Sequence, residues 1–196
     1  MPAGRPSPTE QTSAFAFEGE IRPGVFVRVL EERDAPELFA LVDQERAGLR
    51  RWLPWVDHTR AVEDTLAFVR ASRLQFHKHE AFAAGIWTGE LAGSIGTQPV
   101  DWPNRRVAIG YWLAAKFRGQ GIVTDACRRV VDHAFKVWKL NRVEIHCAVG
   151  NRESAAIPRR LGFERDGVLR QAQRVGEVFH DIEVYSMLSR DWVGGS

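Results

Sequence analysis

The turn at residues 118–124, Arg-Gly-Gln-Gly-Ile-Val-Thr, has residue types and spacing suited to binding an anion. Residues 106–113 before it are rich in β-branched and aromatic side chains, which predicts a strand. After it, apolar side chains recur with helical spacing, at positions 123, 127, 130, 131, 134, 135 and 138. The sequence therefore predicts a strand, a glycine-containing turn and an amphipathic helix, in that order.

Phosphate is the anion that such a turn would bind. The first N–H groups of a helix lack intrahelical partners, and the helix dipole adds partial positive charge there. Gly119 and Gly121 let the backbone approach an oxygen, and Arg118 and Arg128 add charged donors. A plain tight connection between strand and helix also accounts for the glycines. The turn lacks the Gly-Lys-Ser/Thr of a P-loop and the third glycine of a dinucleotide motif, so the ligand need not be a nucleoside triphosphate or NAD.

A second segment continues this pattern toward the C-terminus. Residues 142–149 predict another strand, which Asn151-Arg152-Glu153-Ser154, a short helix and Leu161-Gly162-Phe163 follow. In this order the segments resemble the GNAT superfamily of acetyl-CoA-dependent N-acyltransferases. The tracts at 49–56 (LRRWLPWV), 109–113 (IGYWL) and 141–163 further resemble the Rim-type ribosomal-protein serine/alanine N-acetyltransferases. The resemblance covers about residues 24–192.

The resemblance implies a site for acetyl-CoA. Its pyrophosphate is expected on the backbone amides of the turn, made by Arg118, Gly119, Gln120, Gly121, Ile122, Val123 and Thr124. Its pantetheine arm is expected along Tyr111, Trp112 and Leu113, in the manner of an added strand. The family has a small residue at position 123, so Val123 is expected to contact the ligand through its N–H.

Two further positions match family residues near the reacting end of the cofactor. Asn151 matches a residue whose side chain reaches the pantetheine, and Ser154 matches one near the CoA sulfur. Each also suits a helix-capping role. Attack of an amine on a thioester needs a neutral nucleophile, donors for the oxyanion and a proton for the thiolate. The resemblance implies the Leu113 backbone N–H as oxyanion donor and Ser154 as candidate general acid.

The general base is not assigned by the sequence. The superfamily's usual acid, a tyrosine, is replaced by Pro158, which excludes a tyrosine acid from that helix. Relatives often carry carboxylates at the positions of Ala108 and of the loop 170–174, where this chain has none. The remaining candidates are Glu144, His146, Glu177, His180 and Asp181, although each also suits a surface or ion-pairing role.

A site poor in bases favours a particular class of acceptor. An α-amino group, with a pKa of about 7.7–8.0, is neutral roughly one time in ten at pH 7, whereas a lysine at about 10.4 is neutral less than one time in a thousand. We therefore expect the acceptor to be a protein N-terminus. Two alternatives stay open: an acetyltransferase for a small amine (polyamine, amino acid or antibiotic), and a non-catalytic acyl-CoA-binding module.

Tryptophan is abundant, with 7 in 196 residues. We expect Trp52, Trp55 and Trp87 to line the acceptor site, although large aromatic residues also serve as core. The 6 histidines show no metal-ligand spacing, so no metal is expected. A net charge of +2 without a basic block gives no support to direct nucleic-acid binding, and no apolar run approaches the length of about 20 residues that a membrane span needs.

The chain is expected to form one domain. Residues 1–20 are small, polar and proline-containing and predict a flexible tail, which leaves residues 21–196 as a single N-acetyltransferase domain. The pattern predicts an α/β (α+β) fold: a mixed, mostly antiparallel twisted sheet of about seven strands, with helices on both faces and a central βαβ acyl-CoA site. Asp34 is expected to cap the first helix. Cys127 and Cys147 are expected as unpaired core thiols in a cytoplasmic protein. The sequence does not determine the oligomeric state, and the resemblance implies only that a homodimer is possible, because strand edges often pair into dimers in this family.

Overall fold

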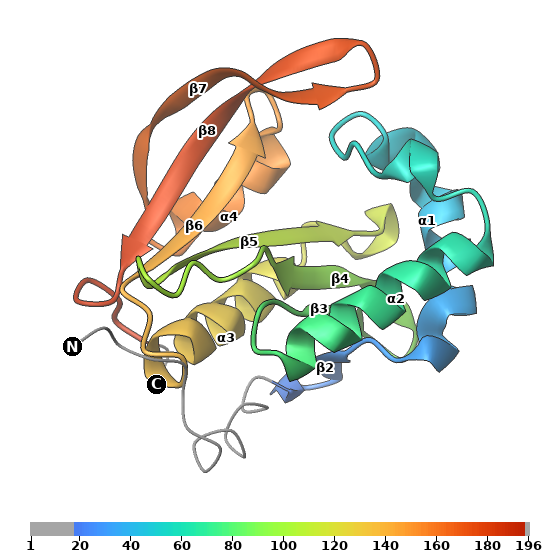
Figure 1. The fold of residues 1–196 in the computed structure, drawn as a ribbon, viewed down its shortest axis with the longest axis horizontal. Coiled ribbons are helices and arrows are strands. Elements are labelled where there is room, and N and C mark those ends of the chain that lie inside the picture. Colours follow the sequence, from blue (N-terminus) through green and yellow to red (C-terminus); the bar gives the residue numbers. More distant parts are fainter. Residues whose placement is uncertain (1–17, 195–196) are drawn as a thin grey trace.

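The computed structural model describes residues 18–194 as one twisted sheet with helices on both faces (Figure 1). The sheet has 8 strands in the order β1-β2-β3-β4-β5-β6-β8-β7, and only the β5–β6 pair is parallel. The strands are β1 (Gly19–Arg22), β2 (Val25–Val29), β3 (Ala83–Trp87), β4 (Leu91–Thr97), β5 (Arg106–Leu113), β6 (Arg142–Ala148), β7 (Glu164–Val175) and β8 (Val178–Leu188). The α-helices are α1 (Ala35–Leu49), α2 (Val62–His77), α3 (Ile122–Lys136) and α4 (Arg152–Arg160). The predicted mixed, mostly antiparallel architecture is confirmed.

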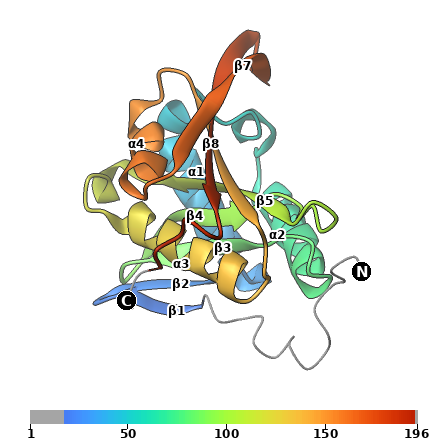
Figure 2. The same ribbon diagram turned by 90° about the vertical axis from the view of Figure 1, so that its left-hand side faces the viewer.

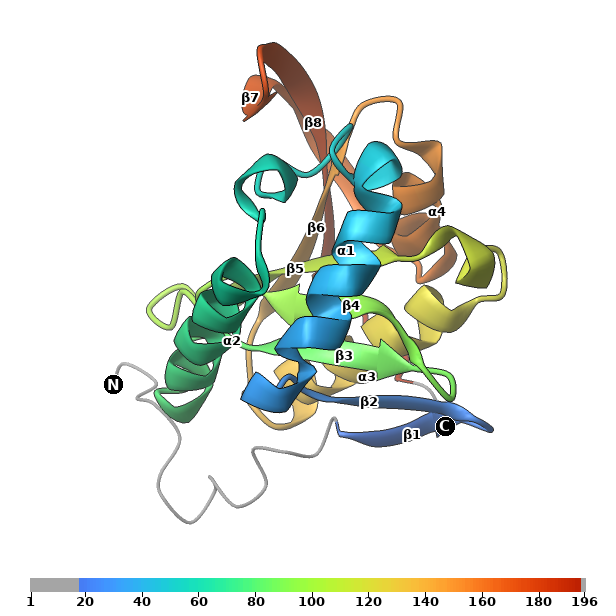
Figure 3. The ribbon, with the colours of Figure 1, turned by 90° about the vertical axis from the view of Figure 1, so that its right-hand side faces the viewer.

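Two helices cover each face of the sheet. Figure 3 shows α1 and α2 across one face, and Figure 2 shows α3 and α4 on the other. The apolar stripe of α3 explains its position, because Val130, Val131 and Ala134 are fully buried in the same core cluster as Val143 and Ile145 of β6. Helix α3 connects the parallel strands β5 and β6, as a βαβ unit requires.

The predicted strand count was one too low. Strand β1 begins at Gly19, inside the segment predicted as tail, and forms a hairpin with β2 around Gly24 at φ 76°. The rest of that segment, residues 1–17, lies outside the described residues. Strand β7 extends to Val175, where it forms a two-stranded ribbon with β8. Strands β1 and β7 are the sheet edges, where a strand-paired homodimer of the kind common in the family would form.

The predicted capping role of Asp34 was wrong. Its side chain makes no cap hydrogen bond to α1. Its carboxylate instead accepts two hydrogen bonds from Arg28, both at 2.7 Å, and one from the backbone N–H of Glu31 at 2.8 Å. A charged pair in fork geometry is stronger than a single backbone cap, which explains why the carboxylate turns toward β2.

Both cysteines are buried and free, as expected. Cys127 lies in α3 and Cys147 in β6. Among residues 18–194, none of the helices combines the length and the apolar character needed to cross a bilayer.

His133 on α3 makes the stability of the fold depend on pH. It is 3% exposed, and burial, with a smaller contribution from the charge of Arg129, lowers its pKa from 6.5 to about 4. The unfolded chain therefore binds a proton more readily than the folded one, so this stability is complete above about pH 6.5 and is lost as the pH falls toward 4. From about pH 7.5 to pH 5, the free energy of unfolding should fall by about 2 kcal/mol more in the native protein than in His133→Gln. Urea titrations of both proteins across this range measure the difference, and parallel pH curves would contradict the prediction.

Candidate functional site

The site is built where β5 and β6 separate. They pair from Arg106–Arg142 to Ile109–Ile145. Beyond this point β5 stays with β4 as far as Leu113, while β6 follows β8 as far as Ala148. In Figure 1, β6 and β8 rise away from the end of β5. A cleft of about 950 Å³ lies at this separation, lined by β5, β6, the 118–124 turn, α4 and the end of α1.

The free edge of β5 faces this cleft. The N–H of Gln98 donates to the carbonyl of Ala108 at 2.8 Å, and the N–H of Ala114 donates to that of Ala92 at 2.9 Å. In an antiparallel ladder, alternate residues direct both backbone groups to the same neighbour, so residues 108, 110, 112 and 114 face β4. The N–H and C=O groups of Tyr111 and Leu113 therefore face the opening, where an extended ligand can pair with them as a strand would.

The 118–124 turn ends at the N-terminus of α3. Gly119 has φ 75°, and Gly121, the N-cap residue, has φ 79°; both lie in the left-handed region that favours glycine. The N–H of Asp125 donates to the carbonyl of Gly121 at 3.1 Å, so the N–H groups of Ile122, Val123 and Thr124 precede the first helical bond. A Cβ placed on Gly119 meets no atom within 4 Å. This open turn with outward amides fits a phosphate group.

Basic side chains surround the turn. Arg22 donates to the carbonyl of Gln120 at 2.7 Å, and Arg160 donates to the hydroxyl of Thr124 at 2.9 Å. Arg22, Arg128 and Arg160 all line the cleft. The sequence did not indicate Arg22, because it lies 98 positions from Gln120 and shares no local pattern with the turn.

Two predicted turn residues differ from expectation in their contacts. The guanidinium of Arg118 donates to the carbonyl of Leu113 at 3.1 Å and pairs with Glu153 at 3.3 Å. Arg118 therefore bridges β5 and α4 instead of extending freely over the turn. The side chain of Gln120 donates to the carbonyl of Lys116 at 3.1 Å, and Gln120 does not line the cleft. The other predicted cofactor residues line it: Tyr111, Trp112, Leu113, Arg118, Gly119, Gly121, Ile122, Val123, Thr124, Asn151 and Ser154.

Ser154 lies at the start of α4 within a small polar cluster. Asn151 caps the helix, since its side-chain oxygen accepts the backbone N–H of Ser154 at 3.2 Å. The Ser154 hydroxyl lies 3.3 Å from the thiol of Cys147 and donates to the phenol oxygen of Tyr111 at 3.5 Å. The phenol donates to the backbone carbonyl of Ser154 at 2.9 Å. Burial raises the pKa of Tyr111, so the phenol stays protonated and the cluster is one of proton donors.

Two of the base candidates lie together. The Nε2 atom of His146 is 2.8 Å from a carboxylate oxygen of Glu144. His146 lines the cleft, whereas Glu144 does not.

Of the three tryptophans expected at the acceptor site, Trp52 lines the cleft. Its backbone carbonyl accepts the side-chain amide of Gln173 at 3.0 Å, and its ring lies 5.8 Å from that of His180. Trp55 does not line the cleft; its ring lies 6.4 Å from that of Trp112. Trp87 also lies outside it, with the guanidinium of Arg28 3.9 Å above its ring. The α1 end and the β7–β8 ribbon thus meet over one side of the cleft.

No group of three or more His, Cys, Asp or Glu side chains in the described part of the chain is arranged to hold a metal ion.

Comparison with known proteins agrees with this geometry. The family model described as "Acetyltransferase (GNAT) domain" matches residues 25–164. The putative ribosomal N-acetyltransferase YdaF of Bacillus subtilis (strain 168) is 36% identical over 180 residues, covering 91% of this chain and 98% of the relative. The ribosomal-protein-serine acetyltransferase of Escherichia coli (strain K12) is 27% identical over 163 residues, covering 83% and 91%.

Solved structures of acetyltransferases share the fold of this chain. The RimL ribosomal L7/L12 alpha-N-protein acetyltransferase in complex with coenzyme A superposes with a TM-score of 0.83 at 28% identity, covering 86% of this chain and 96% of that one. The microcin C7 self-immunity acetyltransferase MccE, in complex with acetyl-CoA and AMP, has a TM-score of 0.84 at 26% identity, covering 90% and 99%. The fold, the open strand edge and the family match agree, and the chain belongs to the GNAT family of acetyl-CoA-dependent N-acetyltransferases.

Proposed function

We propose that the chain transfers the acetyl group of acetyl-CoA to the N-terminal α-amino group of a protein, with a ribosomal protein as the kind of acceptor. One observation carries the proposal: the helix N-terminal amides and the open backbone of Tyr111 and Leu113 face a single cleft, whose other side is formed by Trp52. The relatives named for ribosomal-protein acetylation support the acceptor class.

Coenzyme A would be held by residues along the whole length of the cleft. The amides of residues 119–124 would bind its diphosphate, with Arg22, Arg128 and Arg160 adding positive charge. The Tyr111 backbone N–H and C=O groups would pair with the pantetheine arm, and the Leu113 N–H would remain for the acetyl group. When bound, acetyl-CoA supplies an activated thioester.

The chain's own groups then serve the transfer. The Leu113 N–H donates to the oxyanion that develops on the acetyl carbonyl. The Ser154 hydroxyl gives a proton to the departing thiolate, and the protonated Tyr111 phenol beside it keeps this pocket rich in donors. The acceptor nitrogen bonds to the carbonyl carbon while the carbon–sulfur bond breaks, and one N–H proton leaves the nitrogen.

The charge lining the cleft favours a peptide N-terminus over a polyamine. The carboxylates among the lining residues are Asp125 and Glu153, and both are ion-paired with arginines: Asp125 with Arg22 and Arg128, Glu153 with Arg118. A polycation therefore finds little unpaired negative charge in this lining. The buried free thiols of Cys127 and Cys147 support a cytoplasmic setting as part of the proposal.

An acceptor panel tests the function. We expect thiol release from acetyl-CoA with Ser-starting and Ala-starting peptides to exceed release with spermidine, free amino acids and aminoglycosides. Turnover restricted to the small amines would contradict the proposal, and binding of acetyl-CoA without turnover of any acceptor would indicate a non-catalytic binding module.

Replacement of Trp52 by Ala should raise the KM for the peptide about 10-fold, while the Kd for acetyl-CoA stays near that of the native protein. The Trp52 ring reaches toward Gly150 at the β6–α4 turn, 4.0 Å from a Cβ built there, so it spans the acceptor side of the cleft. Loss of a large aromatic contact of this kind costs about 1–2 kcal/mol. Trp55→Ala, from the same loop but outside the lining, is the matched control. An equal peptide KM for both variants would show that Trp52 does not contact the acceptor.

A further inference from the structure

His146 lies just beyond the part of β6 that pairs with β5, and its side chain faces away from α3. The side chains of Val143, Ile145 and Cys147 are buried in the core cluster that contains the buried residues of α3. Because side chains alternate along a strand, those of Arg142, Glu144 and His146 lie on the opposite face. Pairing with β5 ends at Ile145, so His146 stands where the strands have separated, and it lines the cleft.

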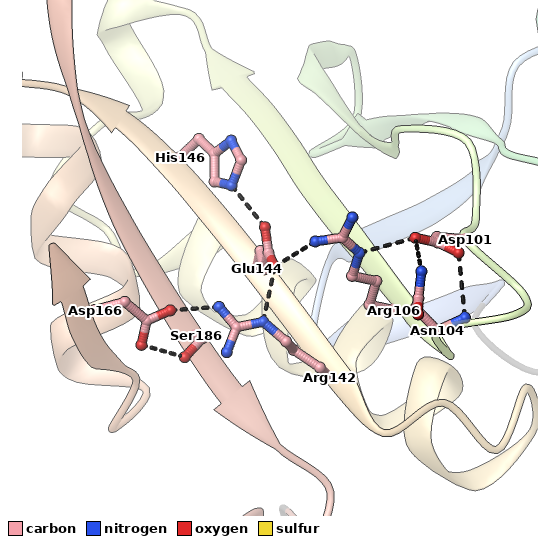
Figure 4. Close-up of polar contacts among 8 residues, drawn as sticks. All are labelled: Asp101, Asn104, Arg106, Arg142, Glu144, His146, Asp166 and Ser186. Atoms are coloured by element: carbon pink, nitrogen blue, oxygen red, sulfur yellow. Dashed lines mark hydrogen bonds and ion pairs between the residues drawn. The ribbon is translucent and has the colours of Figure 1, made fainter. Parts of the chain in front are cut away.

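An ionised carboxylate orients the His146 ring (Figure 4). Glu144 accepts a hydrogen bond from Arg142 at 2.7 Å and lies 3.8 Å from the guanidinium of Arg106. Burial alone would raise the pKa of Glu144, but hydrogen bonds from Arg142 and His146 lower it below its ordinary value. Glu144 is thus a carboxylate at neutral pH. It accepts a hydrogen bond from Nε2 of His146 at 2.8 Å, so Nε2 carries the ring hydrogen.

The same contact determines which ring nitrogen is free to accept a proton. With hydrogen on Nε2, the lone pair of neutral imidazole is on Nδ1. Figure 4 shows Nδ1 pointing away from Glu144. The His146 side chain lines the cleft and is 42% exposed.

The surroundings of Glu144 are themselves held in place. Asp101 binds Arg106 at 2.9 Å, and Asp166 pairs with Arg142 while accepting the hydroxyl of Ser186 at 2.8 Å. The titratable groups linked to His146 through Glu144 are Arg142 on its own strand, Arg106 on β5 and Asp166 on β7 (Figure 4). Such an anchored pair holds the imidazole in one tautomer and one orientation.

We propose that His146 is the general base of the transfer and that Glu144 positions it, an assignment that rests on the function proposed above. The acceptor nitrogen bonds to the acetyl carbon, the carbon–sulfur bond breaks, one N–H proton passes to Nδ1 of His146, and the thiolate takes a proton from Ser154. Solvent then accepts the proton from His146 and returns one to Ser154, which restores both groups. Glu144 is unsuited to act directly, because it does not line the cleft and its proton affinity is lowered by its partners. His146 and Trp52, the residue proposed to contact the acceptor, line the same cleft.

The test compares pH profiles of kcat/KM for a Ser-starting peptide in the native protein, His146→Gln and Glu144→Gln. In the native protein, the plot of log(kcat/KM) against pH should have a slope approaching two at low pH, since both the acceptor amine and His146 must be unprotonated. In His146→Gln this slope should fall to about one, and kcat/KM at pH 7 should be about 10- to 30-fold lower than in the native protein. Glu144→Gln should lower kcat/KM at pH 7 severalfold in the native protein but not in His146→Gln, because the amide no longer selects the tautomer with hydrogen on Nε2 of His146. His77→Gln, an exposed histidine on α2, is the matched control.

An acceptor nitrogen that gives up its proton more readily separates a base from a structural side chain. An N-terminal alkoxyamine is much less basic than an α-amino group, so its N–H proton leaves more easily once the nitrogen has bonded to the acetyl carbon, and the deficit of His146→Gln with this acceptor should shrink severalfold. An unchanged pH profile in His146→Gln, or an equal deficit with both acceptors, would overturn the assignment. If the native protein acetylates only a small amine, the proposed function fails, and the same profiles measured with that amine still decide whether His146 is the base.

Discussion

Replacement of Gly121 by Val is expected to raise the Kd for acetyl-CoA at least about 100-fold, equivalent to about 2.7 kcal/mol. Gly121 has φ 79° at the N-cap of α3, where a β-branched residue is strongly disfavoured. Its Cβ would also lie 3.5 Å from the guanidinium of Arg22. Relief of this strain turns the following amides away from the cleft, so the diphosphate loses several donors together.

Gly24→Val controls for the strain itself. Gly24 has φ 76°, has no atom within 4 Å of a built Cβ, and lies in the β1–β2 hairpin away from the cleft lining. Both variants should lose a similar amount of thermal stability, but only Gly121→Val should lose affinity in isothermal titration calorimetry. Equal affinities in the two variants would show that the turn does not bind the cofactor.

Replacement of Ser154 by Ala is expected to lower kcat about 100-fold, the lower end of the usual contribution of a general acid. The hydroxyl lies among Cys147, Tyr111 and the Asn151-capped start of α4, so its loss removes a proton donor and leaves the helix cap intact, because that cap uses the backbone N–H of Ser154. The Kd for acetyl-CoA should stay within a few-fold of the native value. Stopped-flow measurement of thiol release under single-turnover conditions reports the chemical step directly.

Ser94→Ala is the matched control for this loss of a buried hydroxyl. Ser94 donates to the carbonyl of Ala84 at 2.9 Å within the sheet and does not line the cleft. It should lower stability without lowering kcat. If Ser154→Ala kept a kcat within threefold of the native protein, the proton for the thiolate would have to come from another group, and Tyr111→Phe would be the next variant to measure.

Local patterns in the sequence predicted much of the site. The strand, the turn and the amphipathic α3 are set by short-range periodicity and by the backbone freedom of Gly119 and Gly121. The same is true of Asn151, whose capping contact spans three residues. These features depend on neighbours in the chain, so a single sequence contains them.

Other features depend on residues far apart in the sequence. The strand pairing that stops at Ile109 and Ile145 opens the cleft, and no local pattern in either strand marks that end. The ribbon β7–β8 brings Gln173 to Trp52 across 121 positions. Trp87, expected from composition to face the acceptor, is instead covered by Arg28.

The sequence by itself thus determined the family, the glycine-containing turn before α3 and the polar start of α4, because each is encoded within one segment. Only the tertiary structure decided which arginines surround that turn, that Trp52 alone of the three expected tryptophans lines the cleft, and that Glu144 orients His146. The physical reason is that charge pairing and burial are set by the packing of strands and helices, and packing joins segments whose spacing along the chain carries no signal of their contact.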